Sequence, residues 1–185
     1  EISKIAHLAF KSAQNRRKKL TLVDMANVLE TSRLWRNVVK SIGADYPDVT
    51  LDFLYADNAA KQIISNPKQF DVILTENLFG DILTDEASQI AGSMGMLASA
   101  SVGDGVGFYE PIHGSAHDIA GKNLANPSSV ILASIQMLEY LGMQDKAERI
   151  REAVRATIES GDRVTRDLGG TASTSEFTQA IIDRL

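Results

Sequence analysis

The sequence predicts an α/β fold with a parallel-rich mixed sheet. Short apolar segments with strand character, at 20–23, 51–55 and 72–75, alternate with longer segments in which apolar residues recur at helical spacing. Strands that alternate with helices favour parallel pairing, because each helical crossover returns the chain to the same edge of the sheet. A length of 185 residues with 44% hydrophobic and 23% charged residues is typical of a globular domain.

The elements of the first half follow from periodicity and from residues that end helices. Apolar residues from Ile2 to Ala13 keep helical spacing, so the chain is expected to begin inside a helix. A strand at 20–23 precedes a mainly helical segment at 26–43, with Gly43 at its end. The further elements are a strand at 51–55, a helix at about 59–64, a strand at 72–75 and an acidic helix at about 79–91.

The second half is predicted as a turn-rich span at 98–127 that leads into helices near 128–141, 145–160 and 175–185. No internal repeat, low-complexity tract or long linker interrupts this order. Glycines near 92–95 mark the expected division of the chain into two parts, 1–92 and 93–185.

Charge and composition exclude several classes of partner. A formal net charge of −5 disfavours nucleic acid and anionic membranes, and the basic run at 16–19 is interpreted as the charged end of the opening helix. Cysteine is absent, so disulfides, thiolate metal sites and a cysteine nucleophile are excluded. No apolar run approaches a membrane span, and the first residues lack a signal-peptide pattern. The sequence therefore predicts a cytoplasmic protein.

Two aspartates four residues apart, Asp81 and Asp85, fall on one face of the acidic helix. Like charges stacked in this way repel, so the pair favours a bound cation, and carboxylate oxygens suit Mg²⁺ or Mn²⁺. A solvated acidic face is the alternative, because carboxylate pairs are common on helix surfaces. A third acid, Asp57, closes the strand-like segment 51–57 and strengthens the hypothesis of a metal site.

A glycine-rich segment, Gly-Asp-Gly-Val-Gly at 103–107, follows the acidic helix. Glycines at this spacing more often form plain turns than nucleotide-binding loops. The segment also differs from the usual dinucleotide fingerprint. By itself it does not predict a cofactor.

Several long motifs in fixed order carry a family resemblance. The strings TENLFGDILTD at 75–85, GSMGML at 92–97, HGSAHDIAGK at 113–122 and ANP at 125–127 resemble the β-decarboxylating dehydrogenases, and among them most closely the 3-isopropylmalate dehydrogenases. The resemblance covers essentially the whole chain. It implies the isocitrate/isopropylmalate dehydrogenase-like fold, with two domains around a parallel-rich mixed sheet, of which this chain resembles the C-terminal half. Residues 1–92 then belong to the second domain, which forms the dimer and carries substrate and metal, and 93–185 belong to the cofactor-side domain.

The resemblance also implies an activity and a metal site. The family holds Mg²⁺ or Mn²⁺ with aspartates that match Asp57, Asp81 and Asp85, and the ion binds the hydroxyl and a carboxylate of a 2-hydroxy acid. By this resemblance, Asp57 of one subunit binds the metal ion of the other subunit across a homodimer interface, so residues of both subunits form each active site. The implied reaction is the NAD-dependent oxidative decarboxylation of 3-isopropylmalate to 4-methyl-2-oxopentanoate in leucine biosynthesis. Isocitrate, homoisocitrate and tartrate remain alternative substrates, because the substrate-selecting residues match no part of this chain.

For the cofactor, the resemblance implies that a loop from Glu110 to Asn126 wraps the adenosine of NAD. His113 and Asn126 would contact adenine and Asp118 the ribose hydroxyls, with Gly114 and Ser115 in the same loop. A carboxylate at Asp118 repels a 2′-phosphate, and Ile119 stands where relatives that use NADP tend to carry a cation, so NAD is expected. Asn27 matches an asparagine on the nicotinamide side, although a helix cap is the alternative role for it.

Three residues depart from the family pattern. Ala98 and His117 replace prolines. Because proline restricts the unfolded chain, each replacement is expected to loosen its loop and to lower the free energy of unfolding by under ~1 kcal/mol. Met25 stands at the position of a catalytic lysine, and a thioether neither accepts nor donates a proton. A non-catalytic subunit or pseudoenzyme of the family is therefore the alternative function. Asp24 is either a fourth acid near the site or a strand-end capping residue.

Overall fold

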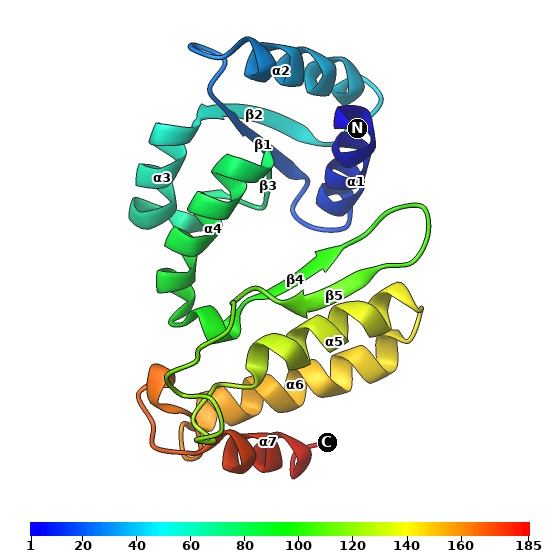
Figure 1. The fold of residues 1–185 in the computed structure, drawn as a ribbon. Coiled ribbons are helices and arrows are strands. Elements are labelled where there is room, and N and C mark those ends of the chain that lie inside the picture. The colour runs from blue at the N-terminus through cyan, green and yellow to red at the C-terminus, as the bar shows by residue number, and fades with distance from the viewer. The chain divides into compact units, whose positions relative to one another are not determined.

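The computed structural model describes residues 1–185, which form two compact units, Glu1–Ala87 and Ser88–Leu185 (Figure 1). The first unit contains α1 (Ile2–Gln14), β1 (Lys19–Asp24), α2 (Glu30–Gly43), β2 (Thr50–Tyr55), α3 (Ala56–Ser65), the 3₁₀ helix η1 (Pro67–Gln69), β3 (Val72–Thr75) and most of α4 (Asn77–Ala91). The predicted division at residues 92 and 93 lies slightly after the boundary between the units. None of the helices is long and apolar enough to span a membrane.

The first unit is a three-stranded parallel sheet in the order β2-β1-β3. The central strand β1 is buried, and its alternating side chains enter two cores because successive residues of a strand point to opposite faces. Leu20 and Leu22 pack with Phe10 of α1 and Val39 of α2. On the other face, Val23 packs with residues of α3 and α4. The expectation of a parallel α/β sheet is confirmed.

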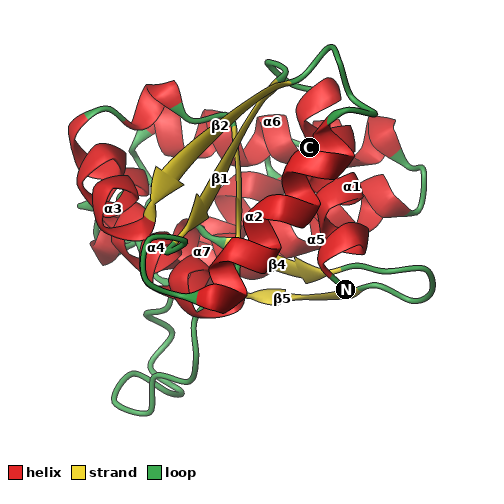
Figure 2. Cartoon of the chain, turned by 90° about the horizontal axis from the view of Figure 1, so that it is seen from above, coloured by secondary structure: helices red, strands yellow, loops and turns green.

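The second unit contains the 3₁₀ helix η2 (Met94–Met96), β4 (Ala98–Ser101), β5 (Phe108–Pro111), α5 (Ser128–Tyr140), α6 (Gln144–Ser160), the 3₁₀ helix η3 (Arg166–Leu168) and α7 (Thr174–Ile182). Strands β4 and β5 pair antiparallel and are joined by an extended loop (Figure 2). A capping box at Ser173 and Glu176 starts α7, and a left-handed Gly161 ends α6.

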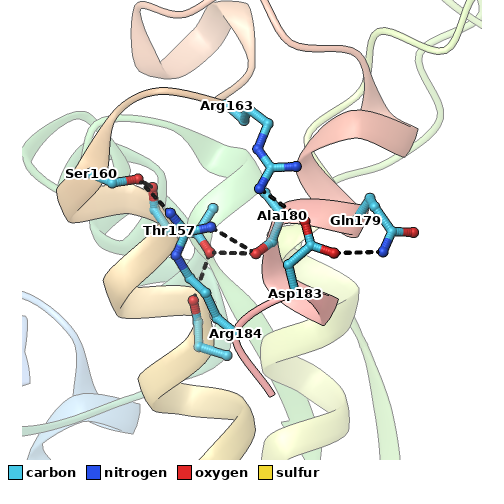
Figure 3. A network of polar contacts seen from close by, with 8 residues as sticks. Thr157, Ser160, Arg163, Gln179, Ala180, Asp183 and Arg184 are labelled. Atoms are coloured by element: carbon cyan, nitrogen blue, oxygen red, sulfur yellow. Dashed lines mark hydrogen bonds and ion pairs between the residues drawn. The ribbon is translucent and has the colours of Figure 1, made fainter.

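Polar contacts join the ends of α6 and α7 (Figure 3). The Thr157 hydroxyl donates to the carbonyl of Ala180 at 3.4 Å, and Arg184 Nη2 donates to Ser160 Oγ at 3.1 Å. The ion pair between Arg163 and Asp183 spans 2.9 Å. An apolar core that includes Val154 and Phe177 lies beside these contacts, so the two helices form a fixed support for the segment between them.

The structure corrects several element boundaries. The helix expected at 26–43 begins only at Glu30, because the Met25 carbonyl accepts from the N–H groups of Val28 and Leu29 and closes a turn there. Asp57 does not close a strand: β2 ends at Tyr55 and Asp57 lies in the first turn of α3. The span 98–127, expected to be turns, contains the hairpin of β4 and β5.

The basic run at 16–19 also differs from its interpretation as a helix end. Helix α1 ends at Gln14, and Lys18 has a left-handed backbone with φ of 60°. Arg16 and Arg17 form ion pairs with Asp71, whose side chain is 1% exposed. The distances from their Nε atoms to Asp71 Oδ1 are 2.9 and 3.6 Å. These cations therefore stabilise the fold at the start of β3 rather than complement a helix dipole.

Candidate active site and cofactor pocket

The carboxyl ends of the three parallel strands meet at one edge of the first unit. Strand β1 ends at Asp24, β2 at Tyr55 and β3 at Thr75. The chain segments that follow these strands carry Met25, Asp57 and the acidic helix α4. Ligands of open α/β sheets bind at this edge, so the fold gathers the predicted catalytic and metal residues of the first unit where such a site is expected.

Asp24 is fully engaged at this edge. Its side chain is 2% exposed and forms a two-point ion pair with Arg36, at 2.8 and 2.7 Å. It also accepts the N–H of Ala26 at 2.9 Å. The hydrogen bond to Asp24 raises the pKa of Arg36, whose guanidinium lies 5.2 Å from the ring centroids of both Phe53 and Tyr55. Asp24 thus has the strand-end role.

Met25 is half-buried and is held through its backbone. Its N–H donates to Ser32 Oγ at 3.2 Å, and the Ser32 hydroxyl donates to Glu76 at 3.3 Å. This chain of contacts links β1 to α2 and to Glu76, the residue after β3. Glu76 lies in the motif at 75–85, but the sequence analysis assigned no role to it or to Ser32. Asn27 is exposed and does not cap α2, because Leu29 is the N-cap and no side-chain hydrogen bond caps that helix.

The predicted metal ligands Asp57, Asp81 and Asp85 are all exposed. Asp81 accepts a hydrogen bond of 2.9 Å from Asn77 Nδ2, one turn earlier on α4, which fixes one carboxylate oxygen. Asp85 lies one turn later on the same helix. No group of three or more His, Cys, Asp or Glu side chains in this chain is placed to hold a metal ion. The three aspartates therefore do not form a complete metal shell within one copy of the chain.

The second unit contains a pocket of about 380 Å³, which falls in the range of about 300–1,000 Å³ typical of small-molecule sites. Its polar lining includes His113, Asn126, Arg166 and Asp167, and its apolar walls include Ile119 and Leu124. Of the residues expected to bind the cofactor, His113, Gly114 and Asn126 line this pocket.

The other predicted cofactor residues lie elsewhere. Glu110 is on β5 opposite Ser99, and Asn27 belongs to the first unit. Ser115 and Asp118 are exposed residues of the same loop as His113 but do not line the pocket. Sequence reasoning missed Arg166 and Asp167, because they lie far along the chain from the loop.

Asn126 and Asp167 are two polar residues of the pocket lining and are called its floor; Asn126 is 9% exposed, and Asp167 is exposed. Asn126 Nδ2 donates to Asp167 at 2.9 Å, and Asn126 Oδ1 accepts the N–H of Ser128 at 2.9 Å. Burial raises the pKa of Asp167, but hydrogen bonds from groups that include Ser93 and Asn126 outweigh it and leave this pKa below its ordinary value. The floor thus presents a stable anion whose charge is already hydrogen-bonded.

The fold and its sites indicate the class of protein: a two-unit α/β chain with acids at the carboxyl edge of a parallel sheet and a separate pocket of small-molecule size. The sequence model of the isocitrate/isopropylmalate dehydrogenase family matches residues 1–181, and the chain therefore belongs to this family of β-decarboxylating oxidoreductases. The family and fold class predicted from the motifs are confirmed.

Individual relatives agree with this assignment. The chain is 56% identical over 185 residues to a 3-isopropylmalate dehydrogenase of Lactococcus lactis, covering 98% of this chain and 53% of the relative. A 3-isopropylmalate dehydrogenase of Novosphingobium aromaticivorans is 52% identical, with coverage of 100% and 54%. The crystal structure of an isocitrate dehydrogenase from Methylococcus capsulatus superposes with a TM-score of 0.95 at 42% identity, covering 99% of this chain and 55% of that one. The chain spans about half the length of the relatives it matches.

Proposed function

We propose that the protein carrying this chain catalyses the NAD-dependent oxidative decarboxylation of 3-isopropylmalate to 4-methyl-2-oxopentanoate in leucine biosynthesis. The observation that supports this most is the 56% identity, over nearly the whole chain, to a relative named 3-isopropylmalate dehydrogenase. The acids at the carboxyl edge of the first unit and the pocket of the second unit supply places for metal and cofactor. The substrate binds between groups that this chain supplies and groups that lie outside it.

In this proposal each copy of the chain offers two metal ligands, Asp81 and Asp85, and lends Asp57 to a second copy in a homodimer. The absence of a three-acid cluster within one chain agrees with such sharing. A bound Mg²⁺ or Mn²⁺ would supply a Lewis acid that lowers the pKa of the substrate hydroxyl. The hydrogen bond from Asn77 orients the Asp81 carboxylate for this role.

For the cofactor, we assign the pocket of the second unit to the adenosine of NAD. Ile119 and Leu124 offer apolar walls for the adenine ring, and His113 lies at the rim. Asp118 lies next to Ile119 in the same loop and would accept hydrogen bonds from the ribose hydroxyls. Arg166 is a cation on the pocket wall that attracts phosphate, so the expected preference for NAD depends on Asp118 outweighing it.

A second candidate function rests on Met25. The side chain at the end of the central strand carries no proton-transfer group, and a protein of this family with that residue would bind ligands but turn them over slowly. A non-catalytic subunit or pseudoenzyme would have these properties.

The test uses the whole protein that carries this chain. Dissociation constants and kcat/KM for 3-isopropylmalate, isocitrate and tartrate are measured with Mn²⁺ and NAD. Tightest binding and highest kcat/KM for 3-isopropylmalate are expected. Preference for another 2-hydroxy acid would overturn the substrate assignment, and binding of 3-isopropylmalate with no NADH production would favour the non-catalytic alternative.

A further inference from the structure

The cofactor loop is held by a segment that no motif associated with it. Asp167, in η3, accepts the 2.9 Å hydrogen bond from Asn126 Nδ2 across 41 residues of sequence. Asn126 is only 9% exposed, so its amide has no alternative partner in bulk solvent. Removing the acceptor would leave a buried N–H group unsatisfied, which is more costly than losing an exposed contact.

Asn126 is also the point where three parts of the pocket meet. Its Oδ1 accepts the first N–H of α5 at Ser128, and its Nδ2 lies 3.7 Å from Met96 Sδ. The backbone of Gly95 approaches it so closely that a Cβ on Gly95 would lie 2.8 Å from Asn126 Cβ. A rotation of the Asn126 side chain would therefore break its contacts with Met96 and with the first N–H of α5.

The same segment holds the loop at a second point. Asn123 has a left-handed backbone with φ of 58°, and its side chain donates to Ser175 Oγ at 2.7 Å and accepts the Ser175 N–H at 3.1 Å. Its carbonyl accepts the N–H of Thr174 at 2.9 Å. The loop is thus hydrogen-bonded at Asn123 and Asn126 to the segment from η3 to the start of α7.

We propose that Asp167 is a positioning residue for nucleotide binding: it fixes Asn126 and thereby sets the shape of the adenosine pocket. This inference rests on the proposed function, in which the pocket receives the adenosine of NAD. Asp167 acts through Asn126 and does not exchange protons with the substrate.

The decisive comparison exchanges the donor and the acceptor. Asp167→Ala removes the acceptor, and Asn126→Asp places two carboxylates opposite each other, so each of these single variants loses the hydrogen bond. The double variant Asp167→Asn with Asn126→Asp restores a donor at 167 and an acceptor at 126, and an aspartate at 126 still accepts the Ser128 N–H. Each single variant is expected to weaken binding of AMP and NAD about tenfold or more, and the double variant to recover most of it.

Calorimetric titration of the whole protein with AMP, NAD and Mn²⁺ provides the measurement. Asp162→Asn, at an exposed acid shortly before η3 that does not line the pocket, is the matched control and should leave all three affinities unchanged. Mn²⁺ affinity should stay the same in every variant, because the metal ligands belong to the first unit. A general loss of structure would instead lower all affinities together.

Different outcomes test the proposed function of the pocket and the positioning role of Asp167. If the unaltered protein binds neither AMP nor NAD, the proposed function of the pocket fails. If it binds both and Asp167→Ala binds them equally well, the positioning role is overturned. Where a single variant unfolds, the double variant decides: a folded double variant that still binds AMP tenfold more weakly also overturns it.

Discussion

Met25 shows how a side chain can be chemically silent while its backbone is firmly placed. Its N–H is bound to Ser32, and its carbonyl closes the turn before α2. The position at the end of the central strand is therefore defined independently of the side chain. A lysine there would have the same backbone support and would bring an amine to the edge of the sheet.

We therefore expect Met25→Lys in the whole protein to raise kcat by about 10²-fold or more, since general acid–base catalysis contributes ~10²–10⁴-fold. The KM for 3-isopropylmalate should change little, because the added group acts on the proton rather than on binding. Steady-state NADH production of both versions is the measurement, with Met25→Leu as the shape-matched control. Equal turnover of the methionine and lysine versions would show that position 25 carries no proton chemistry.

Two neighbouring residues, Asp118 and Ile119, are expected to determine which cofactor binds. The unaltered protein is expected to bind NAD more tightly than NADP, because in the proposed role the Asp118 carboxylate would accept hydrogen bonds from the ribose hydroxyls and repel a 2′-phosphate. Asp118→Ala with Ile119→Lys should reduce the difference between the affinities for NAD and NADP, because it removes the repulsion of the 2′-phosphate and adds a cation that can bind it. Dissociation constants for both cofactors decide the matter. If the unaltered protein bound NADP more tightly than NAD, the positive charge of Arg166, rather than the negative charge of Asp118, would determine the preference.

At the scale of elements, the turn after α1 binds the start of β3 through one buried acid. Asp71 accepts hydrogen bonds from Arg16 Nε at 2.9 Å and from the N–H of Arg17 at 2.8 Å. Burial raises the pKa of Asp71, but these hydrogen bonds outweigh it and hold the pKa below its ordinary value. Because the folded pKa lies below the unfolded pKa of about 3.9, this stabilisation is complete above about pH 4 and is lost as the pH falls through the folded pKa.

Asp71→Asn should accordingly lower the free energy of unfolding at pH 7 by about 1.5–3 kcal/mol, the usual range for hydrogen bonds to a charged group. The difference from the unaltered protein should shrink as the pH falls below about 4. Urea unfolding between pH 7 and pH 3 measures it, and Asp162→Asn serves as an exposed control. A difference that stays constant over this range would contradict the assigned role of the charge.

The sequence predicted the helices and parallel strands of the first unit because strong periodicity and burial agree there. It missed β4 and β5, since segments as short as Ala98–Ser101 and Phe108–Pro111 show no clear alternation and border on glycines. The late start of α2 was also hidden, because it depends on local hydrogen bonds that periodicity does not reveal: the Met25 carbonyl accepts from Val28 and Leu29, and the Arg33 side chain donates to the Ala26 carbonyl at 2.8 Å. Asp167 could not be found for a different reason, because only the tertiary fold brings it to Asn126.

At the scale of the whole molecule, the metal site is expected to exist only when two copies of the chain associate. Mixed dimers test this directly. A dimer of one Asp57→Asn chain and one Asp81→Asn chain has one site with both mutations and one intact site. We expect each variant alone to bind Mn²⁺ weakly and the purified mixed dimer to bind one Mn²⁺ per dimer with the unaltered affinity.

Calorimetric titration of tagged mixed dimers gives the stoichiometry. Asp145→Asn, on α6 in the second unit, is the control that should leave binding unchanged. Weak binding in the mixed dimer would place all ligands in one chain and would contradict the shared site.

The contact between Gly95 and Asn126 has an evolutionary consequence. Because a Cβ at 95 would overlap the Asn126 side chain, the two positions cannot change independently. The nearest overlap is with Asn126 Cβ, so a relative with a larger residue at 95 must carry glycine at 126 or shift the backbone there, and either change removes or displaces the amide that reaches Asp167. We expect these three positions to vary together among members of the family, so that any lineage that abandons the glycine also rebuilds the floor of the pocket.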